Sequence, residues 1–126
     1  MPGNVEIAWS YFHLQGQGRM EDALELLHDG GTFWNVRTLE STTVPDMKTY
    51  IRKVFDKVPM TFTLHNAFED GDHAILEMES HATRSDGETY NNRYCFVIKI
   101  FEGKILHLRE YLNTAAAQAM VDFLNS

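Results

Sequence analysis

Apolar residues recur every three or four positions in several segments, which is the spacing that gathers them on one face of an α-helix. The clearest case is residues 46–58, where one apolar stripe ends before a proline. Residues 4–16 carry stripes on two sides and begin at Asn4, a residue type that caps helices, so we expect a buried helix there. A second helix is expected over residues 19–31, stopped by the glycines of "HDGG", and a closing helix over residues 114–125.

From residue 60 onward the pattern changes to alternation of apolar and polar positions, which is typical of half-buried β-strands. The turn sequences "DGD", "SDGE" and "EG" separate four such segments, which predicts an antiparallel meander. The four segments are residues 61–69, 73–84, 89–101 and 104–113. With an earlier strand at "GTFWNV", the order is helix, helix, strand, helix, four strands, helix. It predicts an α+β fold with helices on one face of a curved antiparallel sheet, in one domain spanning residues 1–126.

The last of these strands, "KILHLREYL", contains the most informative candidate for chemistry. Alternation places Glu110 on the same face as Leu106, Leu108 and Leu112. A carboxylate on an apolar face must be paired, hydrogen-bonded or open to a cavity, and desolvation would raise its pKa toward the range useful for general acid or base catalysis. The alternative is a frayed strand end, where Glu110 reaches solvent or pairs with an arginine.

Two interpretations are compatible with the alternation in "HAILEMESHATR". In the simpler one, Ala74, Leu76 and Met78 face the core and the opposite face is solvated. In the other, Glu79 and His81 line a polar-edged pocket, while the apolar face is covered by a partner subunit.

Two further positions are candidates for ligand contact. Tyr11 faces inward from the first helix, and its hydroxyl needs a partner, either within the core or on a ligand oxygen or developing enolate. In "GTFWNV", Trp34 and Asn35 are adjacent on a strand and therefore face opposite sides.

Composition narrows the classes of partner. The 126 residues include 11 basic and 18 acidic side chains, for a formal charge of −7, which disfavours nucleic acid and anionic membranes as partners. Cys95 is the single cysteine, no signal-peptide pattern is recognised at the start, and no apolar run approaches the ~18 residues of a membrane span, so a cytoplasmic protein is expected. Neither metal-ligand spacing nor a nucleotide-binding glycine motif occurs, so we expect no metal and no cofactor.

With this order of elements, three stretches resemble a known family: "YFHLQGQGRMEDALELLHDGGTFWN", "DGETYNNRYCFVIKIFEGKILHLREYLNTA" and the "GKI" hairpin within it. Over essentially its whole length, the chain resembles the SnoaL-like members of the nuclear transport factor two-like superfamily. The resemblance implies a cone-shaped fold in which helices and a strongly curved sheet enclose a deep apolar pocket. This superfamily includes ketosteroid isomerases, polyketide cyclases, limonene epoxide hydrolases and non-catalytic binding modules.

The resemblance also implies roles for individual residues. Tyr11 matches the tyrosine that donates to the oxyanion in ketosteroid isomerase, whereas Asn35 falls at its aspartate base and Phe96 near its second, acidic donor. Compared with limonene epoxide hydrolase, Asn35 resembles the asparagine that holds the attacking water, and Glu79 and Glu110 fall at the two aspartates of its triad. By this resemblance, both glutamates point into the cone.

The resulting hypothesis is an enzyme that applies general acid/base chemistry, of the isomerase, cyclase or epoxide-hydrolase type, to a hydrophobic small molecule. In it, Glu110 accepts the proton, Glu79 or His81 is its partner, and Tyr11 and Asn35 position a substrate oxygen or a water. The resemblance also implies a homodimer through the convex sheet face. The alternative is a non-catalytic ligand-binding or dimerisation module of the same fold. Residues expected to bind the substrate are His81, Phe96, Tyr94, Phe55, Leu108, Leu112 and Phe62.

Overall fold

Six strands form one curled sheet in the order β2-β1-β6-β5-β4-β3. The computed structural model describes residues 3–126, so Met1 and Pro2, the first residues of the segment in which no signal peptide is expected, lie outside it. The strands are β1 (Leu27–Asn35), β2 (Glu40–Thr43), β3 (Thr61–Asp70), β4 (His73–Thr83), β5 (Thr89–Phe101) and β6 (Lys104–Leu112). The helices are α1 (Asn4–Gly16), α2 (Met20–Leu24), α3 (Val44–Lys57) and α4 (Thr114–Leu124). The predicted α+β class and the four-strand meander are therefore confirmed.

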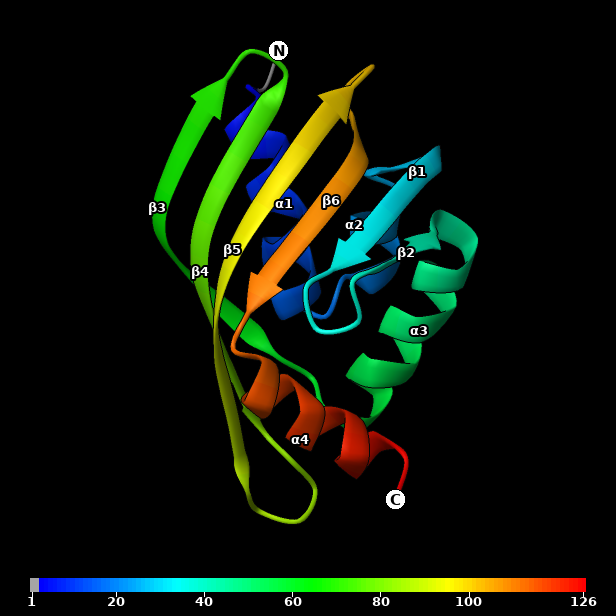
Figure 1. The fold of residues 1–126 in the computed structure, drawn as a ribbon, viewed down its shortest axis with the longest axis vertical. Helices are drawn as coiled ribbons and strands as arrows, with labels where there is room; N and C mark the ends of the chain where they lie inside the picture. The colour runs from blue at the N-terminus through cyan, green and yellow to red at the C-terminus, as the bar shows by residue number, and fades with distance from the viewer. Residues whose placement is uncertain (1–2) are drawn as a thin grey trace.

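The helices pack on the sheet, and the sheet does not close into a barrel. α1 packs across β3 and β4, α3 packs against β1 and β2, and α4 packs against β5. Figure 1 shows α4 at one end of the sheet, beside the long β4–β5 hairpin. All neighbouring strands are antiparallel except β1 and β6, which run parallel. No helix among residues 3–126 has the length and apolarity needed to cross a lipid bilayer.

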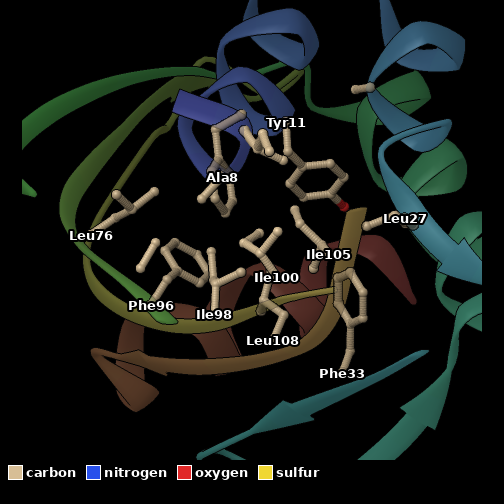
Figure 2. Packing of buried hydrophobic residues seen from close by; sticks show 14 of the residues in the cluster. Ala8, Tyr11, Leu27, Phe33, Leu76, Phe96, Ile98, Ile100, Ile105 and Leu108 are labelled. Atoms are coloured by element: carbon tan, nitrogen blue, oxygen red, sulfur yellow. The ribbon is translucent and has the colours of Figure 1, made fainter. Parts of the chain in front are cut away.

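The concave face of the sheet carries the main core. Leu76, Ile98 and Ile105 are fully buried there, opposite Ala8 and Tyr11 of α1 (Figure 2). This settles the facing of β4, because its apolar positions are covered by α1 of the same chain. The interpretation in which a partner subunit covers this face is therefore wrong.

Simple alternation fails in β6. The register with β5 shifts between Lys99 and Ile100, so that Ile100 pairs with Ile105 but Lys99 pairs with His107. This bulge turns Ile105 inward as well as Leu108, although strict alternation would have placed them on opposite faces.

The second predicted helix is too long, and its "HDGG" stop is wrong. α2 ends at Leu24, and the glycines lie inside β1. The register of β1 with β6 shifts between Leu27 and Thr32, which makes residues 28–31 a bulge. Gly31 lies so close to β6 that an added Cβ would meet the Leu106 carbonyl oxygen at 2.4 Å, so this glycine is required by a close backbone approach rather than by a helix end.

Two smaller predictions also change. The backbone cap of α1 is Gly3, and the Asn4 side chain instead donates to the carbonyl oxygen of Gly71 at 3.0 Å. The turn-prone segment before α3 forms the edge strand β2, and α3 begins earlier, at Val44, because Pro45 is tolerated in the first turn of a helix.

Candidate functional site

A cavity of about 480 Å³ lies between the concave face of the sheet and the helices α1, α3 and α4. Most of its lining is apolar or aromatic, as expected for a site that binds a hydrophobic molecule. Six of the seven residues predicted to bind the substrate line it: Phe55, Phe62, Tyr94, Phe96, Leu108 and Leu112.

Glu110 and Asn35 form a hydrogen-bonded pair on the wall of this cavity. β1 and β6 place them side by side in the parallel register, and the Asn35 Nδ2 donates to Glu110 Oε1 at 2.5 Å. The other end of the amide, Oδ1, accepts the backbone N–H of Arg37 at 2.7 Å, which fixes the orientation of the amide. Asn35 therefore presents a donor to the carboxylate and holds it in place.

Burial raises the pKa of Glu110 to about 7, and the positive charge of Arg37 opposes this rise. Arg37 and Glu110 form no salt bridge with each other, and the Arg37 Nη1 donates to the Gln118 side chain of α4 at 3.1 Å. The exposed part of the Glu110 side chain faces the cavity. The alternative, in which Glu110 reaches solvent from a frayed strand end, is therefore wrong. A carboxylate with a pKa near neutrality can both accept and return a proton under physiological conditions.

Tyr11 contributes a neutral hydroxyl to the same cavity. It is 2% exposed, and Figure 2 shows it projecting from α1 toward the sheet, on the side of Phe33 and Ile105. Burial raises its pKa well above the usual value, so the hydroxyl stays protonated and can act as a hydrogen-bond donor.

A second polar group lines the cavity at the base of the β4–β5 hairpin. The Tyr94 hydroxyl donates to Ser80 Oγ at 2.9 Å, and the Tyr90 hydroxyl accepts from Asn92 Nδ2 at 2.9 Å. Burial raises the pKa of both tyrosines, so both remain neutral. This cluster is internally bonded and forms a polar but uncharged end of the cavity.

Glu79 and His81 do not lie in the cavity, so this part of the site prediction is wrong. Ser80 and Met78 take the concave face, and alternation along β4 turns Glu79 and His81 to the convex face. There Glu79 accepts from His65 at 3.0 Å, and this hydrogen bond lowers its pKa. His81 bonds Thr63 at 2.9 Å beside a separate groove.

Arg37 and Gln15 are polar cavity residues that the sequence pattern did not predict. Arg37 lies in the turn after β1, where the sequence pattern gives no signal. Gln15 is 3% exposed and extends the buried stripe of Ala8, Tyr11 and Phe12 by one helical turn, so a polar residue in an i, i+3, i+4, i+7 series was the available signal. Within residues 3–126, no group of three or more His, Cys, Asp or Glu side chains is arranged to hold a metal ion.

A comparison with known protein families gives a match over most of the chain. The sequence profile of the SnoaL-like domain matches residues 10–108. The chain belongs to the SnoaL-like family. Its cavity residues from Tyr11 to Leu108 fall inside the match, and Glu110 lies two residues beyond it. No curated protein sequence matches the chain.

Solved structures share the fold at low sequence identity. IdmH from Streptomyces antibioticus, a candidate polyketide cyclase, is 13% identical, with a TM-score of 0.81 over 96% of this chain and 99% of that chain. An LEH-like epoxide hydrolase from M. tuberculosis is 14% identical, with a TM-score of 0.80 over 95% and 90%. A candidate isomerase from Bacillus subtilis is 17% identical, with a TM-score of 0.80 over 94% and 93%. At these identities the likeness establishes the fold of the SnoaL-like chain and not its reaction.

Proposed function

We propose that this SnoaL-like chain is a cofactor-independent enzyme that removes a proton next to a carbonyl group of a hydrophobic substrate. One observation carries the proposal. Glu110, held by Asn35, faces an apolar cavity with a pKa of about 7. The reaction is of the isomerase or cyclase type, in which a stabilised carbanion either is reprotonated elsewhere or attacks an electrophilic carbon.

In the proposed step, the Glu110 carboxylate takes the proton from the carbon beside the carbonyl. The electron pair of the broken C–H bond moves onto the carbonyl oxygen, which becomes an enolate. Tyr11 donates a hydrogen bond to that oxygen, and Asn35 keeps the carboxylate oriented. Glu110 then returns the proton to the same carbon or to another carbon of the substrate.

Epoxide hydrolysis with two carboxylates has less support. Glu79, the second carboxylate of that hypothesis, lies on the convex face and is bonded to His65. The site combines one carboxylate of raised pKa with a tyrosine hydrogen-bond donor. This combination fits proton abstraction better than it fits the activation of water by a pair of acids.

The proposal is tested with 2-tetralone, a bicyclic ketone with acidic protons at C1. The protein is incubated with 2-tetralone in D₂O, and exchange at C1 is followed by NMR. We expect exchange faster than in buffer with a matched amount of an unrelated protein. Binding of 2-tetralone without accelerated exchange would contradict the proposal and favour the alternative of a non-catalytic ligand-binding module.

The rate of this exchange is expected to depend on pH through Glu110. The base acts in its ionised form, so kcat/KM should rise about tenfold per pH unit below pH 7 and level off above it. The midpoint of the profile reports the pKa of Glu110 in the free enzyme. A flat profile between pH 5 and pH 9, after subtraction of the uncatalysed rate, would exclude a base with this pKa.

We also propose that the chain forms a homodimer through its convex sheet face. That face carries the half-buried side chains of Ile75 and Val97, and Trp34 packs there against Tyr111 with ring centroids 5.3 Å apart. Sedimentation equilibrium is expected to give the mass of two chains, and Val97→Glu is expected to give the mass of one. A monomeric parent would contradict the proposal.

A further inference from the structure

The Gln15 amide is a buried hydrogen-bond donor without an acceptor. Gln15 is 3% exposed, and its Nε2 makes no hydrogen bond to any group within residues 3–126. Leaving a buried donor unpaired is unfavourable, because the group gives up its hydrogen bonds to water and gains none within the protein. A polar group in this condition calls for an explanation, and one is a role in binding.

The position of Gln15 indicates where its missing acceptor belongs. It follows Tyr11 by four residues on α1, so both side chains lie on one face of the helix, and both line the cavity that contains Glu110. The Gln15 amide is near enough to the Tyr11 hydroxyl to oppose the rise of its pKa, but the two groups are not in hydrogen-bonding geometry. Two neutral donors therefore lie together on the helical wall.

The charges around the cavity restrict the acceptor. Both donors are neutral. The cavity lining also carries the carboxyl groups of Glu110, Glu40 and Asp46 against the single guanidinium of Arg37, so a fully charged anion would be repelled when Glu110 is ionised. A carbonyl or enolate oxygen on an apolar skeleton needs two hydrogen-bond donors and little charge compensation. The apolar lining supplies the surroundings for that skeleton.

We infer that Gln15 donates a hydrogen bond to the substrate oxygen beside Tyr11, and so selects ketones over hydrocarbons of the same shape. This inference rests on the proposed function, because it assigns the second donor for the carbonyl on which the proposed reaction depends. The polar end at Tyr90 and Tyr94 is less suited to this role, since the Tyr94 hydroxyl already donates to Ser80.

The test compares the binding of 2-tetralone with that of tetralin, which has the same bicyclic skeleton without the oxygen. Isothermal titration calorimetry is expected to show roughly 25-fold tighter binding of the ketone by the parent, the value of about two net hydrogen bonds. Gln15→Met keeps the length of the side chain and removes one of the two donors, so the preference should fall to roughly fivefold, the value of the Tyr11 hydrogen bond alone. Gln17→Met is the matched control, because Gln17 is exposed at the end of the same helix.

A structural role for Gln15 would give a different result. If the amide binds a ligand and does not stabilise the free protein, Gln15→Met removes an unpaired buried donor. The melting temperature of the free protein should then rise by roughly 3–6 °C. If the amide stabilises the fold, the melting temperature should fall. A fall in melting temperature, an undiminished ketone preference in Gln15→Met, or a parent that fails to prefer 2-tetralone would each overturn the inference.

The same affinities separate this inference from the proposed function. Glu110→Gln should keep the preference for 2-tetralone even where it cannot exchange the proton. Loss of exchange with an intact preference in Glu110→Gln concerns Glu110 alone. A reduced preference in Gln15→Met, with exchange still measurable at saturating ketone, concerns Gln15 alone.

Discussion

Glu110→Gln is expected to lower the catalysed exchange of 2-tetralone by about a hundredfold or more, within the range typical for removal of a general base. The amide keeps the shape of the side chain and can still accept from Asn35, but it cannot take a proton at neutral pH. Rates are measured at saturating 2-tetralone and at pH 8, where the parent carboxylate is ionised. The effect should appear in kcat, because the hydrophobic contacts that bind the ketone remain.

The matched control is Glu79→Gln, which makes the same chemical change on the convex face. We expect its exchange rate to stay within about twofold of the parent rate, as for a surface change away from the site. Equal losses in the two variants would point to a general effect of charge. An unimpaired Glu110→Gln protein would remove Glu110 from the role of base.

Stability measurements show whether the Glu110→Gln protein is simply misfolded. The folded-state pKa of Glu110 is about 7 and lies above its usual value of 4.5, so the folded state holds the proton more tightly. The parent should therefore lose about 3 kcal/mol of unfolding free energy as the pH rises from 4.5 through 7. Urea unfolding of Glu110→Gln should lack this loss, so above pH 7 the inactive variant is expected to be at least as stable as the parent.

Gly31→Ala is expected to destabilise the fold by about 3 kcal/mol, at the upper end of the range for overpacked positions. The added Cβ would lie 2.4 Å from the carbonyl oxygen of Leu106 and 3.0 Å from that of His28, and both are backbone atoms that cannot rotate away. A third neighbour, Val44 Cγ2, lies at 3.1 Å. The bulge of β1 would have to separate from β6 to accept the methyl group.

Gly30→Ala provides the neighbouring comparison. A Cβ at Gly30 would meet only the His28 ring, at 3.5 Å, which is an ordinary contact. Urea unfolding is expected to show a change of less than about 1 kcal/mol for this variant. Equal destabilisation by the two substitutions would mean that the bulge, and not the close approach of β1 to β6, sets the requirement for glycine.

The sequence pattern predicts those parts of the fold in which local periodicity decides the structure. The stripe of α3 and the turns "DGD", "SDGE" and "EG" led to the correct helix and the correct meander. The pattern fails where pairing between distant strands imposes an irregularity. The bulge of residues 28–31 exists because β1 must match β6, and nothing within "HDGG" distinguishes it from a helix end.

For the site, too, the sequence pattern predicts only those features that local alternation decides. A lone carboxylate among leucines identified Glu110 correctly as a residue facing the interior, because the bulge of β6 lies before Leu108 and leaves the alternation from Leu108 to Glu110 intact. The prediction that Glu79 faces the cavity follows from the family resemblance and is wrong, because the apolar residues Ala74, Leu76 and Met78 of β4 occupy the concave face. A shift of one residue along a strand exchanges its two faces. Gln15 was missed because a single polar residue in an apolar stripe does not by itself predict an unpaired donor.

The pairing of β1 with β6 also determines when the site can form. Asn35 and Glu110 are 75 positions apart in the chain, and a parallel pair cannot be joined by a simple hairpin. Contacts of such high sequence separation carry a large loop-closure entropy and slow the folding of a domain. During synthesis, the amide and the carboxylate cannot meet until β6 has emerged from the ribosome. A nascent chain that ends before β6 can build α1 and the β3–β4 hairpin, but its cavity lacks Glu110, so the proposed proton transfer could begin only when β6 has docked.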